Sequence, residues 1–142
     1  MATLRIFFFL IITAYPGIVI EMQSQQLEVR VTGIEPDKGV IRVCLFDKEE
    51  HFFNKAGECK VKPAPTDGHT ISVRFENDFN KVKYAIAVYQ DINNNGKLDR
   101  NWMGIPTEPY GFSNNPSTFF GPPSFHKAAF EIAGKTSITI KL

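Results

Sequence analysis

The chain has 142 residues, and 16 Lys and Arg against 15 Asp and Glu give a formal net charge of only +1 at pH 7. Such balanced charge, with no basic stripe interleaved with aromatic residues, excludes nucleic acid as a partner. The length suits one domain with one core and leaves no room for a second domain.

The N-terminus has the features of a secretory signal peptide. One positive charge at Arg5 precedes an apolar run over residues 6–20, and a polar stretch begins at Glu21. The run is short for a membrane span and is interrupted by Pro16 and Gly17, which argues against a permanent anchor. We therefore expect a signal peptide over residues 1–24, cleavage near Ser24, and an exported domain over residues 25–142 in the periplasm or outside the cell.

Alternating apolar and polar residues predict strands along the exported domain. Strands are expected over residues 27–33, 40–46, 70–75, 82–89, 128–132 and 136–142. The turn-forming residues 35–39 suggest that the first two strands form a hairpin, and Gly134 suggests a turn between the last two. Residues 47–69 allow a short helical turn near His51 and otherwise a loop. Six or seven strands indicate an all-β fold, an antiparallel β-sandwich of immunoglobulin-like or transthyretin-like shape with about seven strands, and a closed barrel is the alternative.

Cys44 and Cys59 are the two cysteines of the chain. Export places them in an oxidising compartment, so we expect a disulfide that stabilises the fold by roughly 3 kcal/mol. Cys44 shares a strand face with Arg42, which suggests the outer face of a sheet. The bridge would then hold residues 47–60 over that face.

Residues 91–99 resemble the first part of a calcium-binding loop. Oxygen-bearing side chains alternate along Asp91-Ile-Asn-Asn-Asn-Gly-Lys-Leu-Asp99, with glycine at the sixth position. Ca²⁺ takes six to eight oxygens, and loops of this type supply them from alternate positions and one backbone carbonyl. The expected ligands within the loop are Asp91, Asn93, Asn95, Lys97 through its carbonyl, and Asp99. Loops of this type end in a glutamate ligand that is absent at the corresponding position here, so we expect Glu108, further along the chain, to take its role. With three formal negative charges we expect Ca²⁺ to bind at about 10⁻⁴ to 10⁻³ M.

Two alternatives compete for this region. The Asn-Asn-Asn-Gly sequence also suits an ordinary turn, because Asn and Gly tolerate positive φ. The long stretch 91–127 carries no strand period, yet it is rich in aromatic residues, so we expect an ordered loop that a bound ion would organise. Trp102, Tyr110 and Phe112 are the candidate contacts to a protein or glycan partner; they could equally cover the edge of the core.

The segments 84–99 and 104–115 closely resemble the bacterial domain of unknown function 2141 family. The resemblance extends over nearly all of the exported domain and implies a small exported β-sandwich whose role is unassigned. The chain departs from the family where a histidine often precedes the first aspartate, because Gln90 stands there.

No catalytic constellation is recognised. The transthyretin shape is similar to that of hydroxyisourate hydrolases, but the C-terminal tail of those enzymes is absent here. His51, His69 and His126 are scattered, and Ser113 and Ser124 lack the context of a nucleophilic serine. We therefore expect a non-catalytic exported module with a Ca²⁺-ordered loop. The alternatives are a structural or adhesive β-domain without metal and an unrecognised hydrolase.

Overall fold

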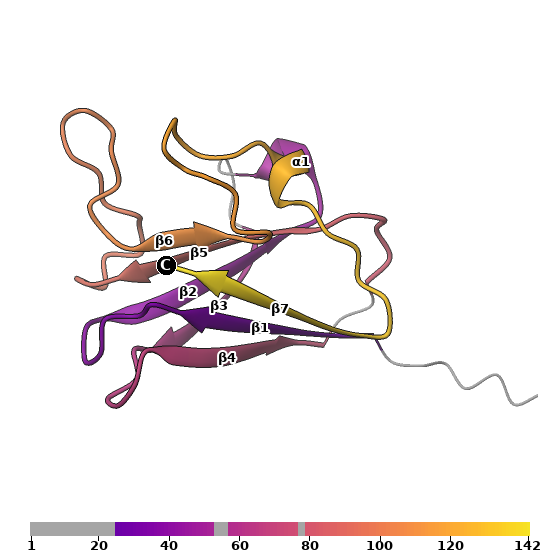
Figure 1. Cartoon of the computed structure of the whole chain (residues 1–142), viewed down its shortest axis with the longest axis horizontal. Coiled ribbons are helices and arrows are strands. Elements are labelled where there is room, and N and C mark those ends of the chain that lie inside the picture. The colour runs from indigo at the N-terminus through magenta and orange to yellow at the C-terminus, as the bar shows by residue number, and fades with distance from the viewer. Residues whose placement is uncertain (1–24, 53–56, 77–78) are drawn as a thin grey trace, which may run out of the picture.

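The computed structural model describes residues 25–52, 57–76 and 79–142, so the expected signal peptide lies outside the described residues. Two sheets pack face to face as a β-sandwich (Figure 1). The three-stranded sheet has the order β4-β1-β7, with β1 at Gln26–Thr32, β4 at Thr70–Phe75 and β7 at Lys135–Lys141. The four-stranded sheet has the order β3-β2-β5-β6, with β2 at Val40–Phe46, β3 at Glu58–Pro63, β5 at Ala85–Asp91 and β6 at Tyr110–Phe112. This confirms the all-β sandwich of about seven strands.

The main core lies between the two sheets, and strand alternation places its side chains there. Leu27, Val29 and Val31 of β1 face Ile41 and its neighbours in the other sheet, and all are fully buried. Burial of each such side chain contributes about 2 kcal/mol to the free energy of unfolding. Ile140 of β7 is also buried, and Ile138 and Leu142 pack against the same cluster, as the sequence predicted.

The predicted hairpin of β1 and β2 is wrong, because the two strands lie in different sheets. β1 pairs with β4 in antiparallel and with β7 in parallel orientation, so the sandwich also contains one parallel pair.

Gln90 holds the connection between the sheets: its amide nitrogen donates to the carbonyls of Glu35 and Lys38, both at 2.7 Å. Gly39 has a φ of +60°, and a Cβ there would lie 2.0 Å from the Asp91 carbonyl oxygen.

β3 falls where the sequence predicted only a short helix and a loop. The expected helical turn is present as a 3-10 helix, η1, at Glu49–His51. β3 is an edge strand with mostly exposed side chains, so it lacks the alternation that reveals a half-buried strand. Cys59 lies directly opposite Cys44 in the β2-β3 register, and their sulfurs are 2.03 Å apart. The disulfide therefore joins neighbouring strands of one sheet, which corrects the prediction that it holds residues 47–60 over the outer face.

A second apolar cluster covers part of the outer face of the four-stranded sheet. Phe52, Phe112 and Phe125 meet edge to face, with ring centroids 6.1 Å apart for Phe52 and Phe112 and 5.7 Å apart for Phe52 and Phe125. Phe125 belongs to the short helix α1, Phe125–Ala128. The expected strand over 128–132 is reduced to one bridge between Tyr84 and Phe130. None of the helices in the described parts of the chain has the length and apolarity needed to cross a membrane.

Candidate functional site

Asp91 is the last residue of β5, and its carboxylate is the centre of the 91–99 loop. The residue is 0% exposed. One oxygen accepts the amide of Asn95 at 3.0 Å, and the other accepts the amide of Gly96 at 2.8 Å and the Arg42 guanidinium Nε at 2.7 Å. Three donors on one buried carboxylate fix the turn that follows the strand.

The other oxygen-bearing side chains of the loop converge on Asp99. The side-chain amides of Asn93 and Asn95 donate to its two carboxylate oxygens at 2.6 and 2.8 Å. The Asn93 side-chain oxygen accepts the amide of Asn95, and the Asn95 side-chain oxygen accepts the amide of Lys97. These are the Asx-type bonds that make Asn favourable in turns. Five of the six expected metal ligands therefore lie within one hydrogen-bonded loop.

Glu108 is buried beside this loop. One carboxylate oxygen accepts the amide of Ile92 at 2.8 Å and the other accepts the amide of Asp99 at 3.0 Å. Glu108 thereby braces both ends of the loop from a distant position in the chain. Among the residues that the structure describes, no group of three or more His, Cys, Asp and Glu is arranged to hold a metal ion.

Two titrating groups at the site are shifted. Burial alone would raise the pKa of Asp91, but hydrogen bonds from Arg42 and from the amides of Gly96 and Asn95 outweigh it and lower the pKa. Burial raises the pKa of Tyr89, the charges of Asp91 and Glu108 add to this rise, and Arg42 opposes it. Asp91 is thus an anion and Tyr89 a neutral phenol that donates to the Gly96 carbonyl at 3.2 Å.

Residues 100–106 project from the end of this loop as a narrow hairpin, which we call the first finger. An antiparallel bridge joins Arg100 to Pro106, and the Asn101 amide donates to the Ile105 carbonyl at 2.9 Å. The Asn101 side-chain oxygen accepts the amides of Met103 and Ile105. Trp102 stands at the apex and is 92% exposed.

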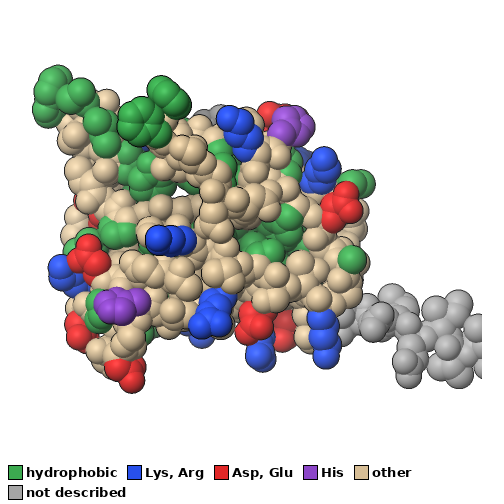
Figure 2. Space-filling view, viewed as in Figure 1, with side chains coloured by type: hydrophobic (Ala, Val, Ile, Leu, Met, Phe, Trp, Pro, Cys, Tyr) green, Lys and Arg blue, Asp and Glu red, His purple; other side chains and the backbone are tan. Residues whose placement is uncertain are grey.

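Residues 116–122 form a second projection, the second finger. A turn bond runs from the Gly121 amide to the Thr118 carbonyl at 3.0 Å, which places Phe119 and Phe120 at the apex. They are 84% and 97% exposed, and their ring centroids lie 4.9 Å apart. Hydrophobic side chains gather at the corner of the molecule from which the two fingers project (Figure 2).

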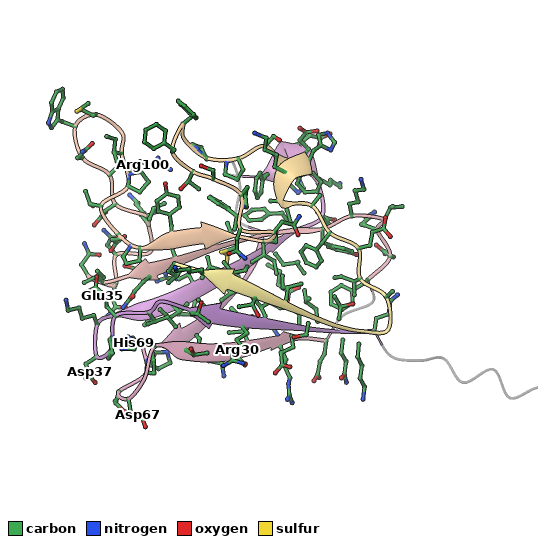
Figure 3. The ribbon with its side chains drawn as sticks, in the orientation of Figure 1. Arg30, Glu35, Asp37, Asp67, His69 and Arg100 are labelled. Atoms are coloured by element: carbon green, nitrogen blue, oxygen red, sulfur yellow. A yellow bond between two sulfur atoms is a disulfide. The ribbon has the colours of Figure 1, made fainter. Side chains whose placement is uncertain are left out.

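The fingers wall a groove on the outer face of the four-stranded sheet, which we call the outer groove. Its volume is about 880 Å³. The strand residues beneath it are mainly apolar or aromatic: Cys44, Phe46, Ala87, Tyr89, Tyr110 and Phe112. The finger residues beside it include Met103, Ile105, Phe119 and Phe120, and the charged residues that line it are Arg42 and Arg100. Arg100 lies at the first finger (Figure 3). Drug-sized ligands bind in cavities of roughly 300–1,000 Å³, so the groove is large enough for one.

The residues expected to contact a partner occupy different places around the outer groove. Trp102 is at a finger apex, Tyr110 is half-buried in the groove, and Phe112 is buried in the second apolar cluster. Phe119 and Phe120 are not among the residues that the sequence singled out as partner contacts, yet both are exposed beside the groove. Their position between prolines and Gly121 was the signal of a turn apex.

The histidines and buried serine have structural partners away from the outer groove. His51 lies 3.6 Å from Asp47 and His126 lies 3.4 Å from Glu49, while His69 bonds the Ile34 carbonyl. The Ser113 hydroxyl accepts the Ile86 amide at 2.9 Å and donates to the Ala128 carbonyl. Ser113 thereby ties α1 to β5.

Comparison with known proteins gives one result. A family model described as "Uncharacterized protein conserved in bacteria (DUF2141)" matches residues 29–140. The matched residues run from β1 to β7 and include the 91–99 loop and both fingers. No curated protein and no solved structure gave a significant match.

Proposed function

We propose, for a chain that belongs to the bacterial family DUF2141, that it is an exported, non-catalytic binding module. Its ligand is an apolar group, either a side chain of a partner protein or the apolar face of a sugar, held in the outer groove. The observation that carries the proposal is the groove of about 880 Å³ between the two fingers. A cavity lined by apolar and aromatic side chains with a few polar groups is typical of a binding site.

The groove chemistry supports binding rather than catalysis. Arg42 is already paired with Asp91 through a 2.7 Å contact, and Tyr89 keeps its proton. A general acid or base needs a pKa near the working pH, and burial raises the pKa of Tyr89 further above that range. Export is supported by the Cys44–Cys59 disulfide, because disulfides persist mainly in oxidising compartments.

The first prediction concerns a variant that fills the outer groove. Ala87 lies on the outer face of β5, opposite Cys44 on one side and Phe112 on the other. Ala87→Phe should place a ring in the groove and lower the affinity for the apolar anion 1-anilinonaphthalene-8-sulfonate by about tenfold, because the added ring occupies the contact area. Titration of the dye fluorescence measures this affinity.

Val82→Phe is the matched control, because it adds the same ring at a position that is 76% exposed and does not line the groove. It should bind the dye as the wild-type chain does. Equal dye affinity of Ala87→Phe and wild type, with both folded by circular dichroism, contradicts binding in the groove.

We further propose that Ca²⁺ binds the 91–99 loop and holds the first finger in place. The donor set fits this ion, because carboxylate and amide oxygens are the ligands it prefers. Asn93 and Asn95 already lie within hydrogen-bond distance of Asp99, and rotation of each amide would turn its oxygen toward the same point. Arg42 beside Asp91 weakens the attraction for a cation, which agrees with weak affinity.

The second prediction is that Ca²⁺ raises the melting temperature. A concentration tenfold above the dissociation constant stabilises the folded state by about 1.4 kcal/mol, which corresponds to roughly 5 °C for a domain of this size. Asp99→Asn should abolish the rise, because it removes a carboxylate from the expected ligand set. Thermal melts in millimolar CaCl₂ and in chelator measure both.

Asp99→Asn is a better test than a change at Asp91, because Asp91 carries three hydrogen bonds that stabilise the fold without an ion. Asn93→Ser, which keeps a side-chain oxygen, serves as the milder comparison. A melting temperature that is identical with Ca²⁺ and with chelator rules out the calcium proposal and leaves the ordinary turn.

A further inference from the structure

We infer that the tips of the two fingers form a docking surface for a lipid bilayer. The inference concerns the apices that project from the molecule and stands whether or not the outer groove holds a ligand. The apex side chains Trp102, Phe119 and Phe120 are 84% to 97% exposed, and Met103 and Ile105 beside them are more than half exposed. Exposed apolar groups gathered at one corner mark an interaction site.

The shape of this surface favours a bilayer over a compact ligand. The most exposed rings stand at turn apices. Hydrophobic side chains project from the body of the protein at this corner (Figure 2). A ring that is almost fully exposed gains little from a ligand lying in the groove beneath it. It gains most from a partner into which it can insert, as aromatic and aliphatic anchors do at the headgroup boundary.

The backbone of the first finger is suited to an apolar environment. Backbone groups that enter the bilayer must find hydrogen-bond partners within the protein. The amides of Met103, Gly104 and Ile105 all donate within the finger, the first and third to the Asn101 side chain and the second to its carbonyl. In the second finger the Gly121 amide donates to Thr118. The apices can therefore leave water with these amides already paired.

The charge of the fingers indicates that the bilayer contains anionic phospholipid. Over residues 100–106 and 116–122 the single charged side chain is Arg100. Its Nη1 donates to the Gly104 carbonyl at 3.0 Å, which holds the guanidinium along the first finger. The acidic groups nearby, Asp99 and Glu108, are already bonded within the loop at its base. Apolar fingers whose one charged side chain is a cation complement a surface that contains anionic phospholipid.

Trp102 makes the docking directly measurable. It is the only tryptophan in the chain, so intrinsic tryptophan emission reports the environment of the first finger alone. Insertion of the apolar N-terminal residues into a bilayer would not by itself change this emission. With the full chain and vesicles of phosphatidylcholine and phosphatidylglycerol, we expect the emission to move to shorter wavelength. Phospholipids brominated on the acyl chains should quench it.

Paired variants identify the surface. The double substitution Phe119→Ser and Phe120→Ser leaves Trp102 in place and should weaken vesicle binding at least tenfold, because two rings no longer enter the bilayer. Val82→Ser, a change at an exposed apolar residue away from the fingers, should bind as the wild-type chain does. Arg100→Gln should weaken binding about fivefold on vesicles with phosphatidylglycerol and leave binding to pure phosphatidylcholine unchanged.

Four results would overturn the inference. The first is wild-type emission that neither shifts nor is quenched when vesicles are added. If the chain still binds the dye in the groove, this result rejects docking to the bilayer and leaves the proposed function intact. The second is equal binding by the serine pair and wild type. The third is an emission shift that depends on protein concentration without lipid, which assigns the tips to a second copy. The groove-filled Ala87→Phe chain should still dock, and loss of docking in it would assign the lipid contact to the groove instead.

Discussion

Asp91 shows how one residue fixes the geometry of the 91–99 loop. Its buried carboxylate accepts two backbone amides and one guanidinium, so its negative charge is balanced and both oxygens are bonded. The same residue begins the pattern that resembles a calcium loop. Because its carboxylate stabilises the fold without an ion, a substitution at Asp91 tests the fold, and metal binding is better tested at Asp99.

The third prediction is that Asp91→Asn lowers the free energy of unfolding by about 3 kcal/mol. In either orientation the amide nitrogen of asparagine would face a donor, from Asn95 or from Gly96 and Arg42, and the partly buried Arg42 would lose its anion. Chemical denaturation at neutral pH measures the loss. Asp67→Asn, at an exposed turn residue, is the control and should change the value by less than about 0.5 kcal/mol.

The fourth prediction follows from the lowered pKa of Asp91 in the folded protein. A carboxyl whose folded pKa lies below its unfolded value of about 3.9 contributes stability that is fully present above that pH. The contribution is lost as the pH falls through the folded pKa. Wild type should therefore lose stability below about pH 4 more steeply than Asp91→Asn. Melting curves of the two chains between neutral and acidic pH measure the difference, and parallel curves would contradict it.

Among the elements, β3 depends most on a covalent bond. Its side chains are mostly exposed, and it pairs with β2 alone at the edge of the sheet. The disulfide joins it to β2 across residues 15 apart in sequence. Hydrogen bonds to one neighbour and one cross-link therefore hold a strand that contributes little to the core.

The fifth prediction is that Cys44→Ala with Cys59→Ala lowers the free energy of unfolding by about 3 kcal/mol. The loss should appear first in β3, so its amides should exchange with solvent faster than those of β2. Hydrogen exchange and denaturant melts of the double variant measure both effects. Val61→Thr, at a half-exposed position of the same strand, is the control. If the β3 amides of the double variant are protected from hydrogen exchange as well as in the wild-type chain, strand pairing alone stabilises β3.

The two fingers are elements of a different kind, because their order comes from turn hydrogen bonds and not from burial. The first finger is closed by the Arg100–Pro106 bridge and the Asn101 side chain. At its base Glu108 and Asp99 connect it to the 91–99 loop. A change that loosens this loop would therefore displace the first finger, which explains how an ion at the loop would act on the outer groove.

On the scale of the whole molecule, the core and the candidate site lie on opposite faces of the four-stranded sheet. β2 and β5 send alternate side chains inward to the core and outward to the second apolar cluster and the groove. Residues on the outer face can therefore be substituted without changing the packing between the two sheets. This separation is why finger substitutions are suitable tests of binding, since they leave the main core intact.

Much of the site followed from local sequence. The spacing of Asp91, Asn93, Asn95 and Asp99 predicted a turn rich in side-chain oxygens, and these residues do meet in one hydrogen-bonded loop. Whether a cation occupies it stays a prediction. The sequence did not predict that Phe119 and the first finger line one groove. Composition alone does not distinguish an exposed aromatic residue of a loop from a buried one.

The sequence by itself determined the strands that alternate, the sandwich they form and the pairing of the two cysteines. Those features depend on local periodicity and on a small number of alternatives. Only the tertiary structure decided that β1 and β2 lie in different sheets, that β3 is an edge strand, and that two distant turns wall one groove. Backbone hydrogen-bonding groups are the same in almost every residue, so they do not select a particular partner strand. The partner of each strand is set by how the apolar faces of the strands pack together.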